Sequence, residues 1–184
     1  MTKIPMNLPN VLTVGRIVLI PPLMALMLAS PLWTMWPALV LYTAIALTDW
    51  LDGHLARMLN QKSEFGRFLD PIADKILVAA MFIALASYGT LHGILLAMPI
   101  IILTREFLVA GLREYLGPKN IIVHVTKLAK WKTTVQMIAI GFLIGGKVYI
   151  SAELCGHLLL LLATGLTITT GWQYFKVALP HFKD

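Results

Sequence analysis

Apolar runs of nearly membrane-spanning length follow one another along the whole of this 184-residue chain. A helix needs about 20 apolar residues to cross the hydrocarbon core of a bilayer. Hydrophobic residues make up 58% of the chain and charged residues only 13%, whereas soluble domains carry about 25% charged residues. We therefore expect an all-α integral membrane protein that forms one domain over residues 1–184. Its six transmembrane helices are predicted at residues 8–29, 35–49, 71–88, 93–112, 133–148 and 154–175.

Lysine and arginine are concentrated in alternate connections between these runs. The segments after the second and fourth runs are rich in both, whereas the connections near residues 30–35, 88–92 and 147–153 contain only Lys147. Loops rich in Lys and Arg stay on the cytoplasmic side of a membrane. We expect a multi-pass protein of the cell (inner) membrane, with both termini and the functional site cytoplasmic. We therefore expect the lipid bilayer to be a binding partner of the chain, and we expect no nucleic acid as a partner in spite of the net positive charge.

Four aspartates, Asp49, Asp52, Asp70 and Asp74, lie close together in this apolar chain. A carboxylate at the bilayer centre costs about 2.5–3.5 kcal/mol, so the set requires cations to offset its charge. The i, i+3 and i, i+4 spacings place each pair on one face of a helix. Carboxylate oxygens without a metal-ligand pattern of Cys or His favour Mg²⁺ or Mn²⁺. We expect two such ions, because paired metals about 3.5–4 Å apart suit displacement at phosphorus.

The residues around the aspartates indicate how the two pairs meet. Pro71 suits the first turn of a helix, so we expect the second pair to open the third helix, while the first closes the membrane part of the second. A hairpin with Gly53 and Gly66 would then bring the pairs together, and each glycine would let a phosphate approach the backbone. Arg57 and Ser63 can add a guanidinium and a hydroxyl for phosphate binding.

The segment 49–74 also carries a longer pattern, D-x2-D-G-x2-A-R-x8-G-x3-D-x3-D, at Asp49, Asp52, Gly53, Ala56, Arg57, Gly66, Asp70 and Asp74. This pattern resembles the signature of the CDP-alcohol phosphotransferase family, membrane enzymes with six transmembrane helices. The resemblance implies that the four aspartates bind two divalent cations, that Asp74 is the general base, and that the protein forms a homodimer. It also implies that Asp49, Gly53, Arg57 and Ser63 contact the CDP moiety. To this CDP-binding set we add Gly66, because a phosphate could approach its backbone closely.

Three further segments resemble one branch of that family, the phosphatidylglycerophosphate synthases. They are residues 104–114, residues 127–137, and the opening set Asn10, Thr13 and Arg16. In this branch CDP-diacylglycerol donates its phosphatidyl group to sn-glycerol 3-phosphate, and CMP leaves. The resemblance therefore implies a phosphatidyltransferase of phospholipid biosynthesis that uses these two substrates.

Charged side chains in the fourth apolar run favour an anionic acceptor. Arg105 and Glu106 lie within that run, where charged residues usually have a function. Arg105 and Arg113 are about two helical turns apart, so they share a face. Lys132, which we place just before the fifth helix, could join them in a basic pocket for the acceptor phosphate. The alternative is an internal ion pair between Arg105 and Glu106 or a residue of another helix.

Two other functions stay open at the level of the sequence. The same chemistry could serve another acceptor, namely inositol phosphate, serine or phosphatidylglycerol, although a neutral acceptor would not need the basic residues. A cation transporter would place its carboxylates near the midplane of several helices. Here the aspartates are confined to one predicted hairpin, which favours the transferase.

Overall fold

Six long helices account for most of the chain. The computed structural model describes residues 8–29, 32–58, 64–119, 121 and 127–182, without the side chains at 9, 49–58, 67 and 127. Within these ranges the structure is entirely helical apart from turns, so the all-α prediction is confirmed. The long helices are α1 (Leu8–Leu28), α2 (Met35–Met58), α3 (Glu64–Ser87), α4 (Ala97–Leu116), α5 (Lys127–Gly145) and α6 (Ile150–Ala178).

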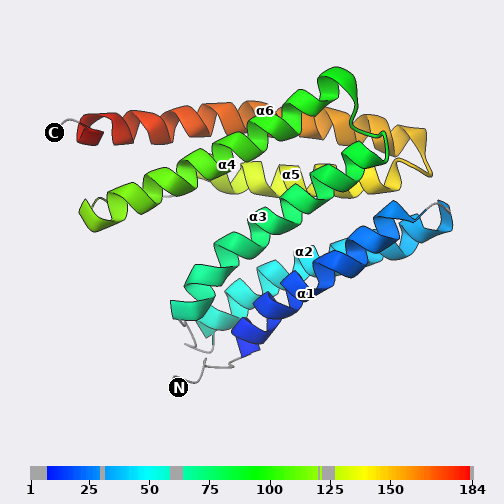
Figure 1. Cartoon of the computed structure of the whole chain (residues 1–184), viewed down its shortest axis with the longest axis horizontal. Helices are drawn as coiled ribbons and strands as arrows, with labels where there is room; N and C mark the ends of the chain where they lie inside the picture. The colour runs from blue at the N-terminus through cyan, green and yellow to red at the C-terminus, as the bar shows by residue number, and fades with distance from the viewer. Residues whose placement is uncertain (1–7, 30–31, 59–63, 120, 122–126, 183–184) are drawn as a thin grey trace.

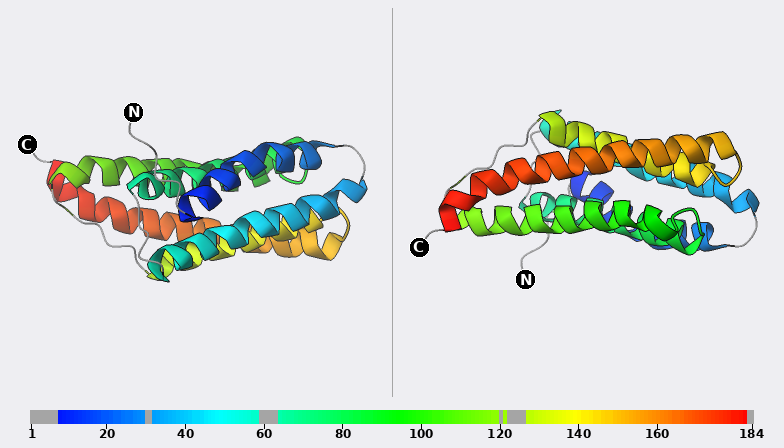
Figure 2. Two further views of the ribbon diagram at one scale, coloured as in Figure 1. Left: turned by 90° about the horizontal axis from the view of Figure 1, so that it is seen from below. Right: turned by 90° about the horizontal axis from the view of Figure 1, so that it is seen from above.

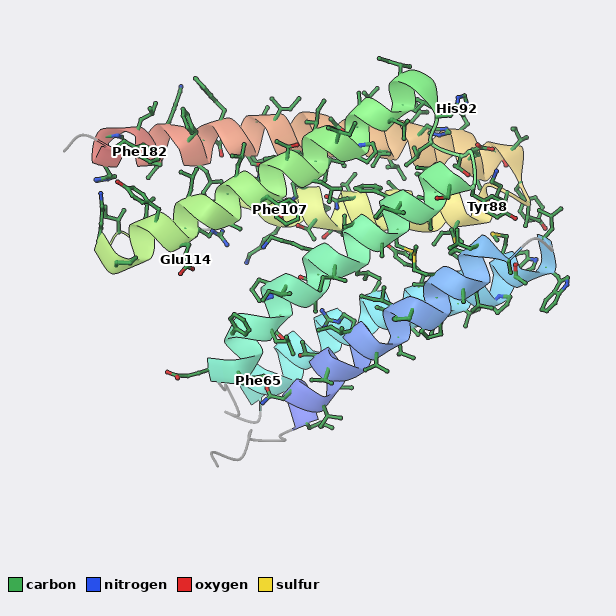
Figure 3. The ribbon with its side chains drawn as sticks, viewed as in Figure 1. Phe65, Tyr88, His92, Phe107, Glu114 and Phe182 are labelled. Atoms are coloured by element: carbon green, nitrogen blue, oxygen red, sulfur yellow. The ribbon has the colours of Figure 1, made fainter. Side chains whose placement is uncertain are left out.

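The helices run back and forth along one elongated bundle (Figure 1). Helix α1 packs against α2 and α3, α6 packs against α4 and α5, and α5 joins the two halves through α2 and α3. Helix α1 begins and helix α6 ends toward the same end of the bundle in all views (Figure 2). Phe65 and Glu114 lie toward this end, whereas Tyr88 and His92 lie toward the other (Figure 3). We call the first the site end.

Three helices extend by six or more residues beyond the apolar runs that predict them, each toward the site end. Helix α2 continues to residue 58 instead of 49, α3 begins at 64 instead of 71, and α5 begins at 127 instead of 133. Hydropathy locates only the apolar part of a helix, and polar residues of good helix propensity continue the same hydrogen-bond ladder beyond it. The prediction that Lys132 precedes the fifth helix is therefore wrong, since this residue lies within α5.

Pro71 lies inside α3 and not in its first turn, so this prediction is also wrong. A proline at an interior position removes the hydrogen bond to the carbonyl four residues earlier, a loss that helices of membrane proteins tolerate when neighbouring groups satisfy the carbonyl. The first turn instead carries Glu64, whose carboxylate interacts favourably with the helix dipole. Asp70 and Asp74 consequently stand well inside α3.

A GxxxG pattern in α5, formed by Gly141 and Gly145, predicts close packing against another helix. The structure confirms this prediction, and the partner is α2. A Cβ atom at Gly141 would lie 3.6 Å from Tyr42, and one at Gly145 would lie 3.9 Å from Leu39. The Tyr42 hydroxyl also donates a hydrogen bond to the Met137 carbonyl at 2.9 Å. These contacts between α2 and α5 connect the two halves of the bundle.

The outer surface of the bundle is apolar. Three described stretches, Asn10–Leu28, Gly93–Lys119 and Ile150–Phe182, are long and apolar enough to cross a membrane. Every long helix also exposes large hydrophobic side chains, among them Val18, Val40, Ile83, Phe107, Ile138 and Leu161. Apolar surface of this extent requires a lipid environment or a protein partner.

The α5–α6 contact makes a prediction about stability. A Cβ atom at Gly156 would lie 2.8 Å from the Leu143 side chain and 3.0 Å from its backbone nitrogen, whereas one at Gly165 would meet nothing within 4 Å. We expect Gly156→Ala to destabilise the protein by about 1–3 kcal/mol, because overpacking displaces the backbone. Thermal unfolding in detergent measures this. The matched Gly165→Ala variant should unfold at or above the wild-type temperature, and equal midpoints for both variants would contradict the packing argument.

Candidate active site

Helix α1 holds both aspartates of α3 by their side chains. The Thr13 hydroxyl donates to Asp70 Oδ1 at 2.7 Å, and Arg16 Nη1 donates to Asp74 Oδ1 at 2.7 Å. The Arg16 side chain is completely buried, while that of Asp74 is 40% exposed. The Asp74 carboxylate is therefore held by a buried cation and still has an accessible side. Charge-assisted hydrogen bonds of this length are among the strong ones in proteins.

The remaining residues of the predicted metal and CDP sites lie on α2 and in the connection that follows it. Asp49, Asp52, Gly53 and Arg57 fall on the helical backbone of α2, but their side chains are outside the described part of the structure. Ser63 is outside the described residues altogether, whereas Gly66 is a buried residue near the start of α3. Both aspartate pairs thus have helical spacing, and the roles given to these residues stay predictions.

The three predicted acceptor residues line one cavity of about 520 Å³ between α3, α4, α5 and α6. A smaller cavity of about 170 Å³ adjoins it at shared residues and brings Asp74 and Gln136 to Arg113 and Lys132. The structure therefore gathers the proposed base and the basic residues around two neighbouring cavities. The charged residues that line the larger cavity are Lys75, Arg105, Glu106, Arg113, Glu114 and Lys132.

Glu106 lies at the centre of this charged group. Its Oε1 accepts a hydrogen bond from Arg105 Nη1 at 3.1 Å and another from Lys132 Nζ. The internal ion pair that the sequence offered as an alternative is thus present, together with the basic cavity and not in place of it. Burial makes each of these charges costly unless it is paired, so Glu106 stabilises two cations beside the cavity.

Arg113 is held differently. It lies two turns beyond Arg105 on α4, and its Nη2 donates to the Tyr174 hydroxyl at 2.9 Å. In the described part of the chain Arg113 makes no ion pair, although Glu114 lies next to it and lines the same cavity. A guanidinium with donors toward a cavity and no carboxylate partner is well suited to bind an anion bidentately.

Lys75 and Tyr174 are parts of the site that the sequence reasoning missed. Lys75 follows Asp74 directly and lines both cavities. The rule that charged residues within apolar helices are functional could have identified it. Tyr174 carries no charge and stands near the end of an apolar helix, where an aromatic side chain most often serves packing. No signal in a single sequence distinguishes it.

The two aspartates whose side chains are described, Asp70 and Asp74, fit the expected metal chemistry. Asp70 and Asp74 provide carboxylate oxygens, the donors that Mg²⁺ and Mn²⁺ prefer. Each has one oxygen hydrogen-bonded by α1, and partners of this kind orient carboxylates that bind metal ions. No cluster of three or more potential ligands occurs among the described side chains, so a complete site would need the two aspartates of α2 as well.

Comparison with known proteins places the chain among membrane phosphatidyltransferases. Residues 6–170 match the family model described as CDP-alcohol phosphatidyltransferase. Three curated relatives are each named CDP-diacylglycerol–glycerol-3-phosphate 3-phosphatidyltransferase. The relative from Rickettsia bellii is 42% identical over 98% of this chain and 99% of its own. The relative from Cereibacter sphaeroides is 38% identical over 97% and 98%, and that from Escherichia coli K12 is 36% identical over 97% and 98%.

The contact between α1 and α3 predicts energetic coupling between Arg16 and Asp74. We expect Arg16→Met and Asp74→Asn each to lower stability. The double variant should be more stable than the sum of the single effects, by about 0.5–3 kcal/mol, because either single change already removes the interaction between the two side chains. Thermal unfolding in detergent measures this coupling. Arg16→Met combined with Glu153→Gln, which lies in the first turn of α6, is the control and should be additive; additivity in the Arg16–Asp74 pair would refute the ion pair.

Proposed function

Because the chain belongs to the CDP-alcohol phosphatidyltransferase family, we propose that it transfers the phosphatidyl group of CDP-diacylglycerol to glycerol 3-phosphate. The products are phosphatidylglycerol phosphate and CMP. The relatives named for this reaction align over nearly their full length. The choice of glycerol 3-phosphate as acceptor rests on one observation. Arg105, Arg113 and Lys132 line the same cavity, and Asp74 lines the smaller cavity beside it.

The charge of the cavity suits a phosphomonoester. Four basic and two acidic side chains line it, which leaves an excess of positive charge in a site that is partly shielded from water. Attraction between opposite charges is several times stronger there than in bulk water. Arg113 offers donors to the acceptor phosphate, and Gln136 lines the smaller cavity together with Asp74.

The reaction is a displacement at the phosphorus that carries diacylglycerol. Asp74 accepts the proton of the 1-hydroxyl of glycerol 3-phosphate, the oxygen forms a new bond to this phosphorus, and the bond to CMP breaks. Arg16 stabilises the ionised form of Asp74, the form that can accept a proton. When bound by Asp49, Asp52, Asp70 and Asp74, two Mg²⁺ or Mn²⁺ ions would neutralise the diphosphate and the leaving oxygen.

In this proposal all six helices lie in the cell (inner) membrane and the site end faces the cytoplasm. The distribution of Lys and Arg and the apolar outer surface support this placement. The acyl chains of the donor then stay in the bilayer, while its headgroup meets a water-soluble acceptor at the membrane surface. The homodimer that the family resemblance implies is part of the same proposal.

The other acceptors account less well for the site. Serine carries no phosphate, so the excess of positive charge in the cavity would have no partner. Inositol phosphate is anionic and would suit the same charges, but the relatives are named for glycerol 3-phosphate. A transporter accounts less well for the aspartates, because all four lie on two consecutive helices, α2 and α3, and not on the several helices that would line a transport pathway.

Purified protein in detergent with CDP-diacylglycerol and Mg²⁺ tests the acceptor. We expect label from glycerol 3-phosphate to enter lipid as CMP is released, and label from serine or inositol phosphate to stay in water. Arg113→Met should raise the KM for glycerol 3-phosphate roughly 10- to 100-fold, as expected for a lost hydrogen bond to a charged group. Lys119→Met is the control, because Lys119 contacts Tyr115 and the His181 carbonyl outside the cavity. Incorporation of another labelled acceptor in place of glycerol 3-phosphate would overturn the proposal.

The same assay tests the proposed base and the metal ions. Asp74→Asn should lower kcat roughly 10²- to 10⁴-fold, the usual contribution of a general base, whereas Glu153→Gln at the far end of the bundle should have no effect. Removal of divalent cations with EDTA should abolish turnover, and Mg²⁺ or Mn²⁺ should restore it. Wild-type kcat in Asp74→Asn, with folding verified by thermal unfolding, would exclude the proposed role.

A further inference from the structure

One turn of α6 supports both arginines of the cavity through a single aromatic ring. The guanidinium carbons of Arg105 and Arg113 lie 5.3 and 5.2 Å from the centre of the Tyr174 ring. The hydroxyl of the same tyrosine accepts the hydrogen bond from Arg113. Only 3% of Tyr174 is exposed, and the Arg105 side chain is 12% exposed, whereas Arg113 is an exposed residue that lines the cavity. Cation–π attraction is stronger at the desolvated Arg105 than at the exposed Arg113.

Two neighbours of Tyr174 complete the support for Arg105. The Thr170 hydroxyl accepts a hydrogen bond from Arg105 Nη2 at 3.0 Å and donates its own proton to the Leu166 carbonyl at 2.7 Å. Gly171 leaves room for the side chain, because a Cβ atom there would lie 2.9 Å from Arg105 Cγ. Positions 170, 171 and 174 share one helix face. We call Thr170, Gly171 and Tyr174 the α6 seat.

The seat opposes two forces that would otherwise move the arginines. The two guanidinium groups, which contact the same ring, repel each other, and Glu106 attracts Arg105 toward Lys132. The ring face attracts both cations at once, while the two hydroxyls accept from one cation each. The seat therefore holds two forks of N–H donors beside the cavity in a defined geometry before a ligand binds, which lowers the entropic cost of binding.

We propose that Tyr174 is a positioning residue that determines the affinity of the enzyme for its phosphate-bearing acceptor. It acts through Arg105 and Arg113 and does not touch the reacting atoms. This inference rests on the proposed function and extends it, because it assigns acceptor recognition to α6 as well as α4. The aspartates lie on α2 and α3, so a change at Tyr174 should leave binding of the CDP headgroup intact.

Two substitutions separate the contributions of the ring and the hydroxyl. Tyr174→Phe keeps the ring and loses the hydrogen bond to Arg113, so the KM for glycerol 3-phosphate should rise roughly 3- to 10-fold. Tyr174→Leu loses both, and the same KM should rise roughly 10- to 100-fold. In each variant the KM for CDP-diacylglycerol and the kcat at saturating acceptor should stay within about twofold of wild type. Phe175→Leu, a half-exposed aromatic next in sequence, is the matched control and should behave as wild type.

Inorganic phosphate provides a second readout that a merely structural role would not change. As a competitor of glycerol 3-phosphate it contacts the same donors, so its inhibition constant should rise in parallel with KM in both variants. Gly171→Ala should also raise the KM for glycerol 3-phosphate and the inhibition constant of phosphate, because the added methyl group would displace the Arg105 side chain. A structural role would instead lower the unfolding temperature and reduce kcat with both substrates' KM values changed together, and that pattern in Tyr174→Phe would overturn the inference.

The outcomes distinguish this inference from the function on which it rests. If the wild-type protein fails to transfer the phosphatidyl group to glycerol 3-phosphate, the proposed function is wrong. If the wild type does so and Tyr174→Phe keeps the wild-type KM and phosphate inhibition, the inference alone is wrong. Should Tyr174→Leu not fold, Tyr174→Phe with an unchanged unfolding temperature still decides between the two results.

Discussion

The ion pair between Arg16 and Asp74 is the contact on which the rest of the site depends. A buried guanidinium without a partner would cost several kcal/mol in an apolar bundle, so α1 and α3 must stay in the register that pairs it. Thr13 reinforces this register through Asp70, and the large apolar side chains of both helices, among them Leu23 and Leu77, pack in the common core. The orientation of both carboxylates is therefore a property of the fold.

Charge balance explains the other half of the site in a similar way. The cavity needs an excess of positive charge to bind an anion, yet several cations placed together in an apolar surrounding repel one another. Glu106 reduces this repulsion by pairing with Arg105 and Lys132, and Tyr174 reduces it further without adding a charge. Arg113 keeps its positive charge for a ligand because its partner is a neutral hydroxyl. A third carboxylate, in place of Tyr174, would reduce the excess of positive charge that the cavity offers to an anion.

The sequence predicts those parts of this arrangement that are expressed as charge or hydropathy. Six apolar runs predict six helices, and Arg105, Arg113 and Lys132 can be assigned to one pocket because charged side chains in an apolar bundle must gather where they find partners or water. Helix ends are less predictable. Pro71 is typical of the first turn of a helix, but α3 begins earlier, at Glu64. The seat on α6 cannot be predicted at all, since Tyr174 meets Arg113 from 61 positions away and contacts of neutral residues leave no periodic signal.

The bundle divides the proposed reaction between its two halves. Helices α2 and α3 carry the aspartates, α4, α5 and α6 carry the acceptor residues, and α3 faces both because it bears Asp74 and Lys75 in succession. A different acceptor would require new side chains on α4 to α6 and at Lys75 of α3, while the carboxylates for the chemistry at phosphorus could stay. The two halves meet where α5 packs on α2 and α3 and where α4 contacts α3. These helix contacts together set the distance between Asp74 and the acceptor residues, and the close approach of α2 at Gly141 is one of them.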